Sequence, residues 1–368
     1  MDKVNTTSEV AATSDFFETW ISDEVLWVIT VVNYVILSGT ISFLGVIFNI
    51  VNVLIFAKLG FSDTTNISFL SLSLADGGVV LMLVGYSILY NPLVVEAVSI
   101  LEVIESVSYI VFGWPYACFS RVAGCMTAFI TVERFLCVSA PLKVKAIITR
   151  SRTITMAVTC FFVLFASIIP AFISSSLGMK FDPIYNQTHV GLMFTNNAAS
   201  LQEISLTFNV VVQLGVFCIV VVFTVALIRS FVRKTEWRST ATKQSTKSNV
   251  RDSKMVKMVI LISVVFIILS IPGVIATFLM MFIPEYNIAG RYRNIYIASF
   301  STFFPIGAIN STVNFFIFLD MSTKYRQMFL TMFNLKSWKP KEKKKVQRQI
   351  YKDSPKNSKQ EKINNFTI

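Results

Sequence analysis

The chain has 368 residues, of which 54% are hydrophobic and only 15% charged, with 33 phenylalanines, one histidine and a formal net charge of +12. A water-soluble domain needs more charge to cover its surface, whereas lipid solvates the apolar outside of an integral membrane protein. The basic balance alone would suit nucleic acid, but most Lys and Arg residues gather in short segments between long apolar runs. We therefore expect a protein that contacts the lipid bilayer and binds no nucleic acid.

Apolar runs recur along the chain at a length that suits membrane-spanning helices. Crossing about 30 Å of hydrocarbon takes about 20 helical residues. The runs that qualify cover about 34–58, 66–90, 108–138, 153–175, 204–229, 255–283 and 294–319. The predicted fold class is an all-α membrane protein, a seven-transmembrane helix bundle over 34–319. No internal repeat is visible, so a transporter built from inverted repeats gains no support.

The distribution of positive charge predicts the topology. The basic segments lie near Lys58, at 143–152, at 229–257 and after Lys324. Because basic loops stay in the cytoplasm, residues 1–33 are predicted to be an extracellular N-terminal segment and the C-terminus to be cytoplasmic. This is the topology of a multi-pass plasma-membrane protein. The sequons at Asn5 and Asn186 then lie outside and are glycosylation candidates.

After the last span the long apolar runs end, and an amphipathic stretch and a lysine-rich tail follow. The stretch "MSTKYRQMFLTMF" places apolar side chains on one helical stripe: Tyr325, Met328, Phe329, Met332 and Phe333. We expect an amphipathic helix over 320–333 and a disordered basic tail over 334–368. The five cysteines all lie inside apolar runs and are interpreted as small buried hydrophobes, so neither a disulfide nor a metal site is predicted.

Polar side chains at membrane depth are functional candidates, because burying them in lipid is costly. Asn49, Asp76, Asn310 and Asn314 are interpreted as one hydrogen-bonded layer joining three helices, or alternatively as a hydrated ion site with a sodium ion near Asp76. Arg121 of the third span cannot shed its proton and needs a partner. Asp76, a backbone carbonyl or a ligand carboxylate would each serve.

Short motifs occur in a fixed order along the spans. They are Asn49, Asp76 in "LSLAD", Glu133-Arg134-Phe135, Pro141-Leu142, Phe266 with Pro272, and Asn310-Ser311 with Asn314. In this order and spacing the chain resembles the rhodopsin-family G-protein-coupled receptors over nearly the whole bundle. The resemblance implies a receptor rather than an enzyme, with an extracellular ligand and a heterotrimeric G protein as partners.

The resemblance also implies roles for these residues. Glu133 would hold Arg134 in the resting state, together with Asp252 at the inner start of the sixth helix. The sixth helix would pivot at Phe266 and Pro272 and free Arg134 for the G protein, with Pro141 and Leu142 beside it. The intramembrane network would comprise Asn49, Asp76, Asn310, Ser311 and Asn314.

Several positions depart from the family pattern. Tyr109 stands where a disulfide cysteine is usual, and Ser270 replaces the tryptophan before Pro272. Phe315 and Phe318 replace the proline and tyrosine of the seventh-helix motif. Activation is therefore expected to use altered contacts at these places.

The ligand is the least constrained part of the prediction. The outer half of the third span offers Trp114, Tyr116, Phe119 and Arg121, an aromatic pocket with one cation. Such a pocket would suit a small acid, an amino acid or an amidated peptide, although aromatic rings also pack in cores without any ligand.

Four stretches narrow the subgroup. They are "TVERFLCVSAPLKVKAIITRSRT", "RSFVRKTEWRSTATKQSTKSNVRDSKMVKMV", "EYNIAGRYRNIY" and "MSTKYRQMF", and they resemble chemosensory receptors of gastropod molluscs, themselves similar to FMRFamide-type neuropeptide receptors. The resemblance implies a sensor of an external chemical cue, or alternatively a neuropeptide receptor. A membrane transporter or channel is the rival class, but only Arg121 and Asp76 would line its path. No HExxH or GxSxG motif points to an enzyme.

Overall fold

A computed structural model of the protein describes residues 21–98, 101–182, 186–241, 247–286 and 290–335, the side chains of residues 145, 182 and 238–252 excepted. The chain forms two compact units, Met1–Arg326 and Gln327–Ile368. Asn5 and the tail beyond residue 335 lie outside the described residues. The first unit holds the helical bundle.

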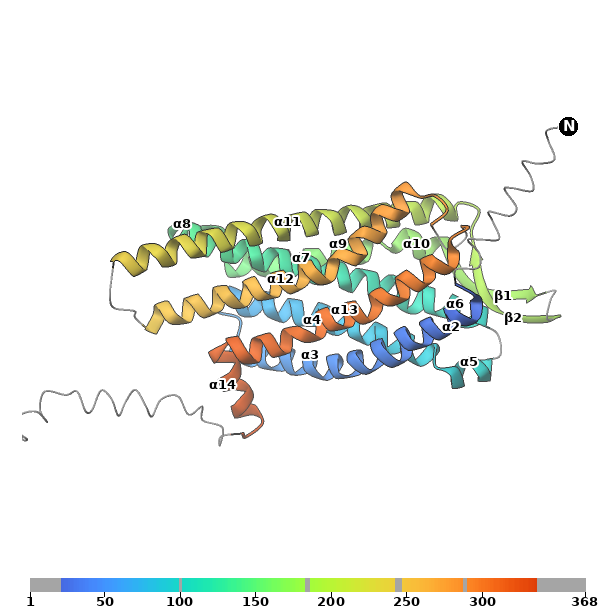
Figure 1. Ribbon diagram of the computed structural model, residues 1–368, viewed down its shortest axis with the longest axis horizontal. Coiled ribbons are helices and arrows are strands. Elements are labelled where there is room, and N and C mark those ends of the chain that lie inside the picture. The colour runs from blue at the N-terminus through green and yellow to red at the C-terminus, as the bar shows by residue number, and fades with distance from the viewer. Residues whose placement is uncertain (1–20, 99–100, 183–185, 242–246, 287–289, 336–368) are drawn as a thin grey trace, which may run out of the picture. The chain divides into compact units, whose positions relative to one another are not determined.

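Helices dominate the described residues (Figure 1). In chain order the elements are α2 (Asp23–Val31), the π-helix η1 (Val32–Ser38), α3 (Gly39–Leu59), α4 (Thr64–Leu89), α5 (Pro92–Val98), α6 (Leu101–Val107), the π-helix η2 (Ser108–Gly113), α7 (Trp114–Ser139), α8 (Pro141–Ile147), α9 (Arg150–Ala166), α10 (Ile169–Ser174), β1 (Ser175–Asp182), β2 (Gln187–Phe194), α11 (Ala198–Ala241), α12 (Lys247–Phe282), α13 (Arg293–Met321) and α14 (Thr323–Met332).

Seven helical segments among the described residues are long and apolar enough to cross a membrane. They are Asp23–Leu59, Thr64–Leu89, Leu101–Ser139, Arg150–Ser174, Ala198–Trp237, Ser253–Phe282 and Arg293–Met321. The predicted seven-helix, all-α fold class is thereby confirmed. Large apolar side chains such as Phe43 and Phe162 point outward, 62% and 73% exposed, where lipid would solvate them.

The first spanning segment begins well before its predicted start near residue 34. Ser22 caps α2, because its side chain accepts a hydrogen bond from the Val25 backbone N–H at 3.3 Å. Asp23 and Glu24 occupy the first turn, where negative charge favours a helix start. The acidic pair interrupts the apolar pattern, so hydropathy alone places the start too late.

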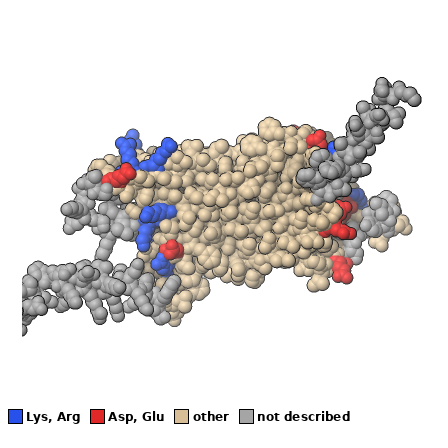
Figure 2. Space-filling model, in the orientation of Figure 1, with Lys and Arg blue, Asp and Glu red and all other residues tan. Residues whose placement is uncertain are grey.

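On the face shown in Figure 2, charged side chains gather at the two ends of the bundle and leave a broad uncharged belt between them. We call one end the basic end. It carries the α3–α4, α7–α9 and α11–α12 connections. The other, the hairpin end, carries β1 and β2. An uncharged belt between polar ends is the surface expected of a bilayer-spanning bundle.

The connection between α10 and α11 folds into a β-hairpin. β1 and β2 pair antiparallel, from Ser175 opposite Phe194 to Asp182 opposite Gln187. Asn186 lies at the turn, exposed and at φ 50°, a left-handed conformation that asparagine tolerates. The hairpin is held to α6 by polar contacts, since Lys180 Nζ lies 2.6 Å from Glu102 Oε1. All five cysteines are free thiols.

α4 lies at the centre of the bundle, in contact with α3, α7, α9 and α13. Two glycines allow aromatic rings to approach it closely. A Cβ at Gly78 would lie 2.3 Å from the ring of Phe119, and one at Gly85 would lie 2.1 Å from the ring of Phe112. Small residues at such interfaces let membrane helices pack closely, so η2, through Phe112, and α7, through Phe119, pack closely against α4.

Candidate functional site

A cavity of about 340 Å³ lies between α7, α11, α12 and α13. Three of the predicted pocket residues line it, namely Trp114, Tyr116 and Arg121. Phe119 is not among its lining residues, because its ring packs between Gly78 of α4 and Phe165 of α9. The remaining walls are largely aromatic and include Phe217, Phe266, Tyr296, Phe300, Phe303 and Phe304. The cavity has the apolar walls and few polar groups typical of a small-molecule site.

Arg121 is the charged residue in this cavity. Its Nη2 donates to the Oε1 of Gln213 on α11 at 2.5 Å. Its Nε is buried and has no hydrogen-bond partner among the described residues. Of the partners expected from sequence, Asp76 bonds to Asn314 instead. The hydrogen bond from Arg121 is accepted by the side-chain oxygen of Gln213 rather than by a backbone carbonyl.

The intramembrane polar residues join α13 to two other helices. Asn314 Nδ2 donates to Asp76 Oδ2 at 2.8 Å. Asn49 Nδ2 donates to the Ser311 carbonyl at 2.9 Å and to the Gly45 carbonyl of its own helix at 3.0 Å. Asn310 and Ser311 also line the cavity. The floor of the cavity therefore adjoins the polar contacts that hold α3, α4 and α13 together.

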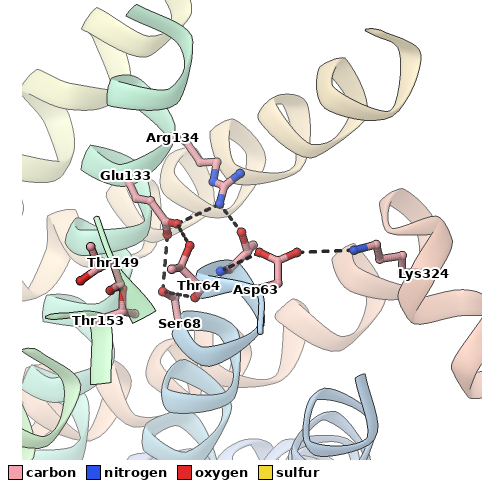
Figure 3. A network of polar contacts seen from close by, with 9 residues as sticks. Asp63, Thr64, Ser68, Glu133, Arg134, Thr149, Thr153 and Lys324 are labelled. Carbon is pink, nitrogen blue, oxygen red and sulfur yellow. Dashed lines mark hydrogen bonds and ion pairs between the residues drawn. The ribbon is translucent and has the colours of Figure 1, made fainter. Parts of the chain in front are cut away.

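At the basic end a second polar cluster surrounds Glu133 and Arg134 (Figure 3). Arg134 Nη2 lies 3.1 Å from Glu133 Oε1 and also donates to Thr65 Oγ1 of α4. Thr64 Oγ1 donates to Glu133 Oε1 at 2.7 Å. Glu133 is only 1% exposed, so α4 supplies hydroxyls to a buried carboxylate. The pair on α7 is thus fixed by the first turn of α4.

Asp63 extends this cluster towards α14. It caps α4 by accepting from the Thr65 backbone N–H at 3.1 Å, and its other oxygen lies 3.4 Å from Lys324 Nζ. Burial tends to raise the pKa of the Asp63 carboxyl. The side-chain and backbone hydrogen bonds from Thr65 and the charges of Lys324 and Arg134 outweigh burial and hold that pKa below its ordinary value.

The other predicted switch residues are Asp252, Pro141 and Leu142. Asp252 belongs to α12, but its side chain lies outside the described residues, so its pairing with Arg134 stays a prediction. Pro141 begins α8, a position that suits proline. Leu142 beside it is 92% exposed at the basic end. A leucine so exposed there is available to a partner protein.

α7 and α12 contact each other through a hydroxyl pair and through the cavity wall. Thr131 Oγ1 and Ser263 Oγ lie 2.7 Å apart and both are buried. Phe266, one turn further along α12, lines the cavity and reaches towards Gly124 of α7. Pro272 lies inside α12, where a proline removes one backbone hydrogen bond of the helix. The pivot of the sixth helix at Phe266 and Pro272 stays a prediction.

Some residues of the site were not identified from sequence. Gln213 interrupts an apolar run in the fifth span, a signal of the same kind that singled out Arg121. Tyr325 was predicted only to lie on the apolar stripe of the amphipathic helix, and in the structure it is fully buried. Its hydroxyl donates to Asn52 Oδ1 at 2.5 Å, and its ring contacts Phe318. Hydrophobic periodicity identifies the apolar face of a helix, but it does not show which residues pack against that face.

The fold and these two polar centres are those of a seven-helix membrane receptor. Residues 48–318 match the family model of the 7 transmembrane receptor (rhodopsin family). The chain belongs to this family of G-protein-coupled receptors. No curated protein sequence matches it significantly. Receptors of this family are generally signalling proteins rather than enzymes.

Proposed function

We propose that the protein senses a chemical cue outside the cell and activates heterotrimeric G proteins. One observation carries this proposal: Arg121 in the cavity and Arg134 in the basic-end cluster are borne by the same helix, α7. At 1.5 Å per residue they are separated by roughly 20 Å along it. On this proposal, a ligand contact and a G-protein contact would lie on one continuous helix.

The orientation follows from charge. The basic end is assigned to the cytoplasm of a plasma-membrane protein and the hairpin end to the outside, because basic loops are retained inside. Asn186 on the hairpin then faces outward as a glycosylation site. Leu142 and Arg134 face the G protein.

Activation would pass through α12. A ligand in the cavity contacts Phe266, and α12 is tied to α7 by Thr131 and Ser263. A ligand that favours an outward position of α12 would break this hydroxyl pair and open the cluster around Arg134. The same shift would separate Asp252 from Arg134 if the two pair at rest.

The cue is proposed to be a small molecule, which suits a chemosensory role. The cavity volume of about 340 Å³ lies at the lower end of the range of about 300–1,000 Å³ for small-molecule sites. An amidated neuropeptide of the FMRFamide type is the alternative. It would have to place only its terminal residue in the cavity.

A sodium ion at Asp76 is a further part of the proposal. Asp76 Oδ1 and the Oγ of Ser73, one turn before it on α4, are buried without hydrogen-bond partners among the described residues. The Ser311 side chain is also near Asp76. Oxygen donors of this kind fit a hard cation. The ion would neutralise the carboxylate and stabilise one arrangement of α4 and α13.

The direct test is a set of sensors for G-protein dissociation in cells that express the receptor. They would be exposed to small waterborne metabolites, amino acids and amidated peptides. We expect at least one class of compound to dissociate a G protein in receptor-expressing cells only. Ligand-dependent ion flux in reconstituted vesicles without any G protein would instead favour the transporter or channel.

A further inference from the structure

The cavity contains an unneutralised cation. Arg121 stays protonated in any protein environment, and Gln213 offers it a neutral amide oxygen. Asp and Glu are absent from the described residues that line the cavity. The buried carboxylates of Asp76 and Glu133 bond to other groups, Asp76 to Asn314 and Glu133 to Arg134 and Thr64. A charged guanidinium in such surroundings is costly without an anion.

We propose that the cavity recognises a small carboxylate with an aromatic or apolar body, bound through Arg121. The buried, unpartnered Nε of Arg121 is the donor that a second carboxylate oxygen would take up, since guanidinium and carboxylate match in two parallel hydrogen bonds. This inference rests on the proposed receptor function and names its ligand class.

Gln213 and Asn209 shape the rest of the polar contact. Gln213 accepts from Arg121 through its oxygen, so its amide nitrogen is left to donate to the same carboxylate. Asn209, one turn away on α11, donates to the Ser205 carbonyl at 2.9 Å. Its Oδ1 is buried in the cavity wall and has no partner in the described part of the chain. A ligand N–H or O–H group beside the carboxylate would satisfy it.

The aromatic walls select the body of the ligand. Tyr116 and Phe304 pack against each other with ring centroids 4.8 Å apart, and both line the cavity. A flat apolar group fits against such rings. An amidated peptide carries no terminal carboxylate, so the proposal favours a free acid over an amidated neuropeptide.

Binding is tested on the purified full-length receptor in lipid nanodiscs, without a G protein. Phenylacetate, 3-phenylpropionate and indole-3-acetate are each titrated beside their primary amides, and thermal unfolding is followed. Sodium chloride at equal concentration controls for ionic strength. We expect at least one acid to raise the unfolding midpoint, and its amide and chloride to leave it unchanged. Amides that stabilise as well as the acids, chloride that reproduces the effect, or no shift with any acid would each overturn the proposal.

Variants locate the contact. Arg121→Gln should weaken acid binding by roughly 10- to 100-fold, the range for a lost charged hydrogen bond, without lowering the midpoint of the ligand-free receptor. Arg293→Gln is the matched control, because Arg293 is a half-exposed cation at the hairpin end, outside the cavity lining.

Undiminished binding in Arg121→Gln would overturn the proposal. So would a lower ligand-free midpoint in this variant, because Arg121 would then be a structural group. Acid binding without G-protein activation would leave this inference standing and count against the proposed function alone.

Discussion

Arg134 of α7 donates a hydrogen bond to Thr65 of α4. The arginine of the third-helix triplet is thus held by a neighbouring helix as well as by Glu133 beside it. Thr65 lies in the first turn of α4, directly after the Asp63 cap. The resting position of Arg134 therefore depends on where α4 begins.

Replacing Thr65 by valine removes this acceptor and keeps the shape of the side chain. A hydrogen bond to a charged group contributes about 1.5–3 kcal/mol, and about 1.4 kcal/mol shifts a two-state equilibrium tenfold. We expect Thr65→Val to raise ligand-independent signalling by about tenfold or more, measured with a G-protein dissociation sensor at matched surface expression. Thr40→Val at the start of α3, where the hydroxyl donates to the Ile36 and Leu37 carbonyls of the preceding η1, should not. Equal basal signalling in both variants would show that Thr65 does not restrain Arg134.

Asp252→Asn is expected to raise basal signalling as well. The substitution removes a charge from the inner start of α12 without changing side-chain size, so a resting pair with Arg134 would be weakened. The same sensor measures the effect. Basal activity that stays unchanged at matched surface expression would count against this lock and leave Thr131 and Ser263 as the contact between α7 and α12.

Tyr325→Phe should destabilise the receptor by about 1–3 kcal/mol, because Asn52 Oδ1 is left buried without its donor. A double-mutant cycle with Asn52→Ala, followed by thermal unfolding in micelles, isolates the pair. We expect the two substitutions together to cost less than the sum of their separate effects. Strict additivity would mean that the Tyr325 hydroxyl contributes nothing through Asn52.

The acid stability of the receptor is expected to depend on Asp63. Its pKa is lower in the folded than in the unfolded state, so it stabilises the fold above the unfolded value of about 3.9. This contribution is lost as the pH falls through the lower folded pKa. The gap in unfolding midpoint between the native receptor and Asp63→Asn should therefore be constant from about pH 7 to 5 and narrow below about pH 4. A gap that widens on acidification would mean that burial, rather than its partners, controls Asp63.

The spans could be predicted from sequence because lipid exposure requires long apolar runs, and Asp76 and Arg121 stood out against them. The helix starts were harder to place. The first span begins at the Ser22 cap with the acidic residues Asp23 and Glu24, and a hydropathy pattern does not count such polar residues as part of a span. The partners of the singled-out residues could not be predicted. Whether Arg121 reaches Asp76 or Gln213 depends on how α7 is rotated against α4 and α11, and hydropathy does not record that rotation. Burial of Tyr325 likewise depends on how the chain turns directly after α13, which brings Tyr325 to Asn52.

The central claim is that ligand binding beside Arg121 activates a G protein through Arg134. The most direct measurement is nucleotide exchange on purified heterotrimeric G proteins by the receptor in lipid vesicles, with the aromatic acids and amidated peptides as ligands. We predict that a ligand accelerates exchange on the native receptor, that Arg134→Gln abolishes the acceleration, and that ligand binding survives in that variant. Full acceleration by Arg134→Gln, or ligand-driven ion flux with no exchange on any G protein, would contradict the account.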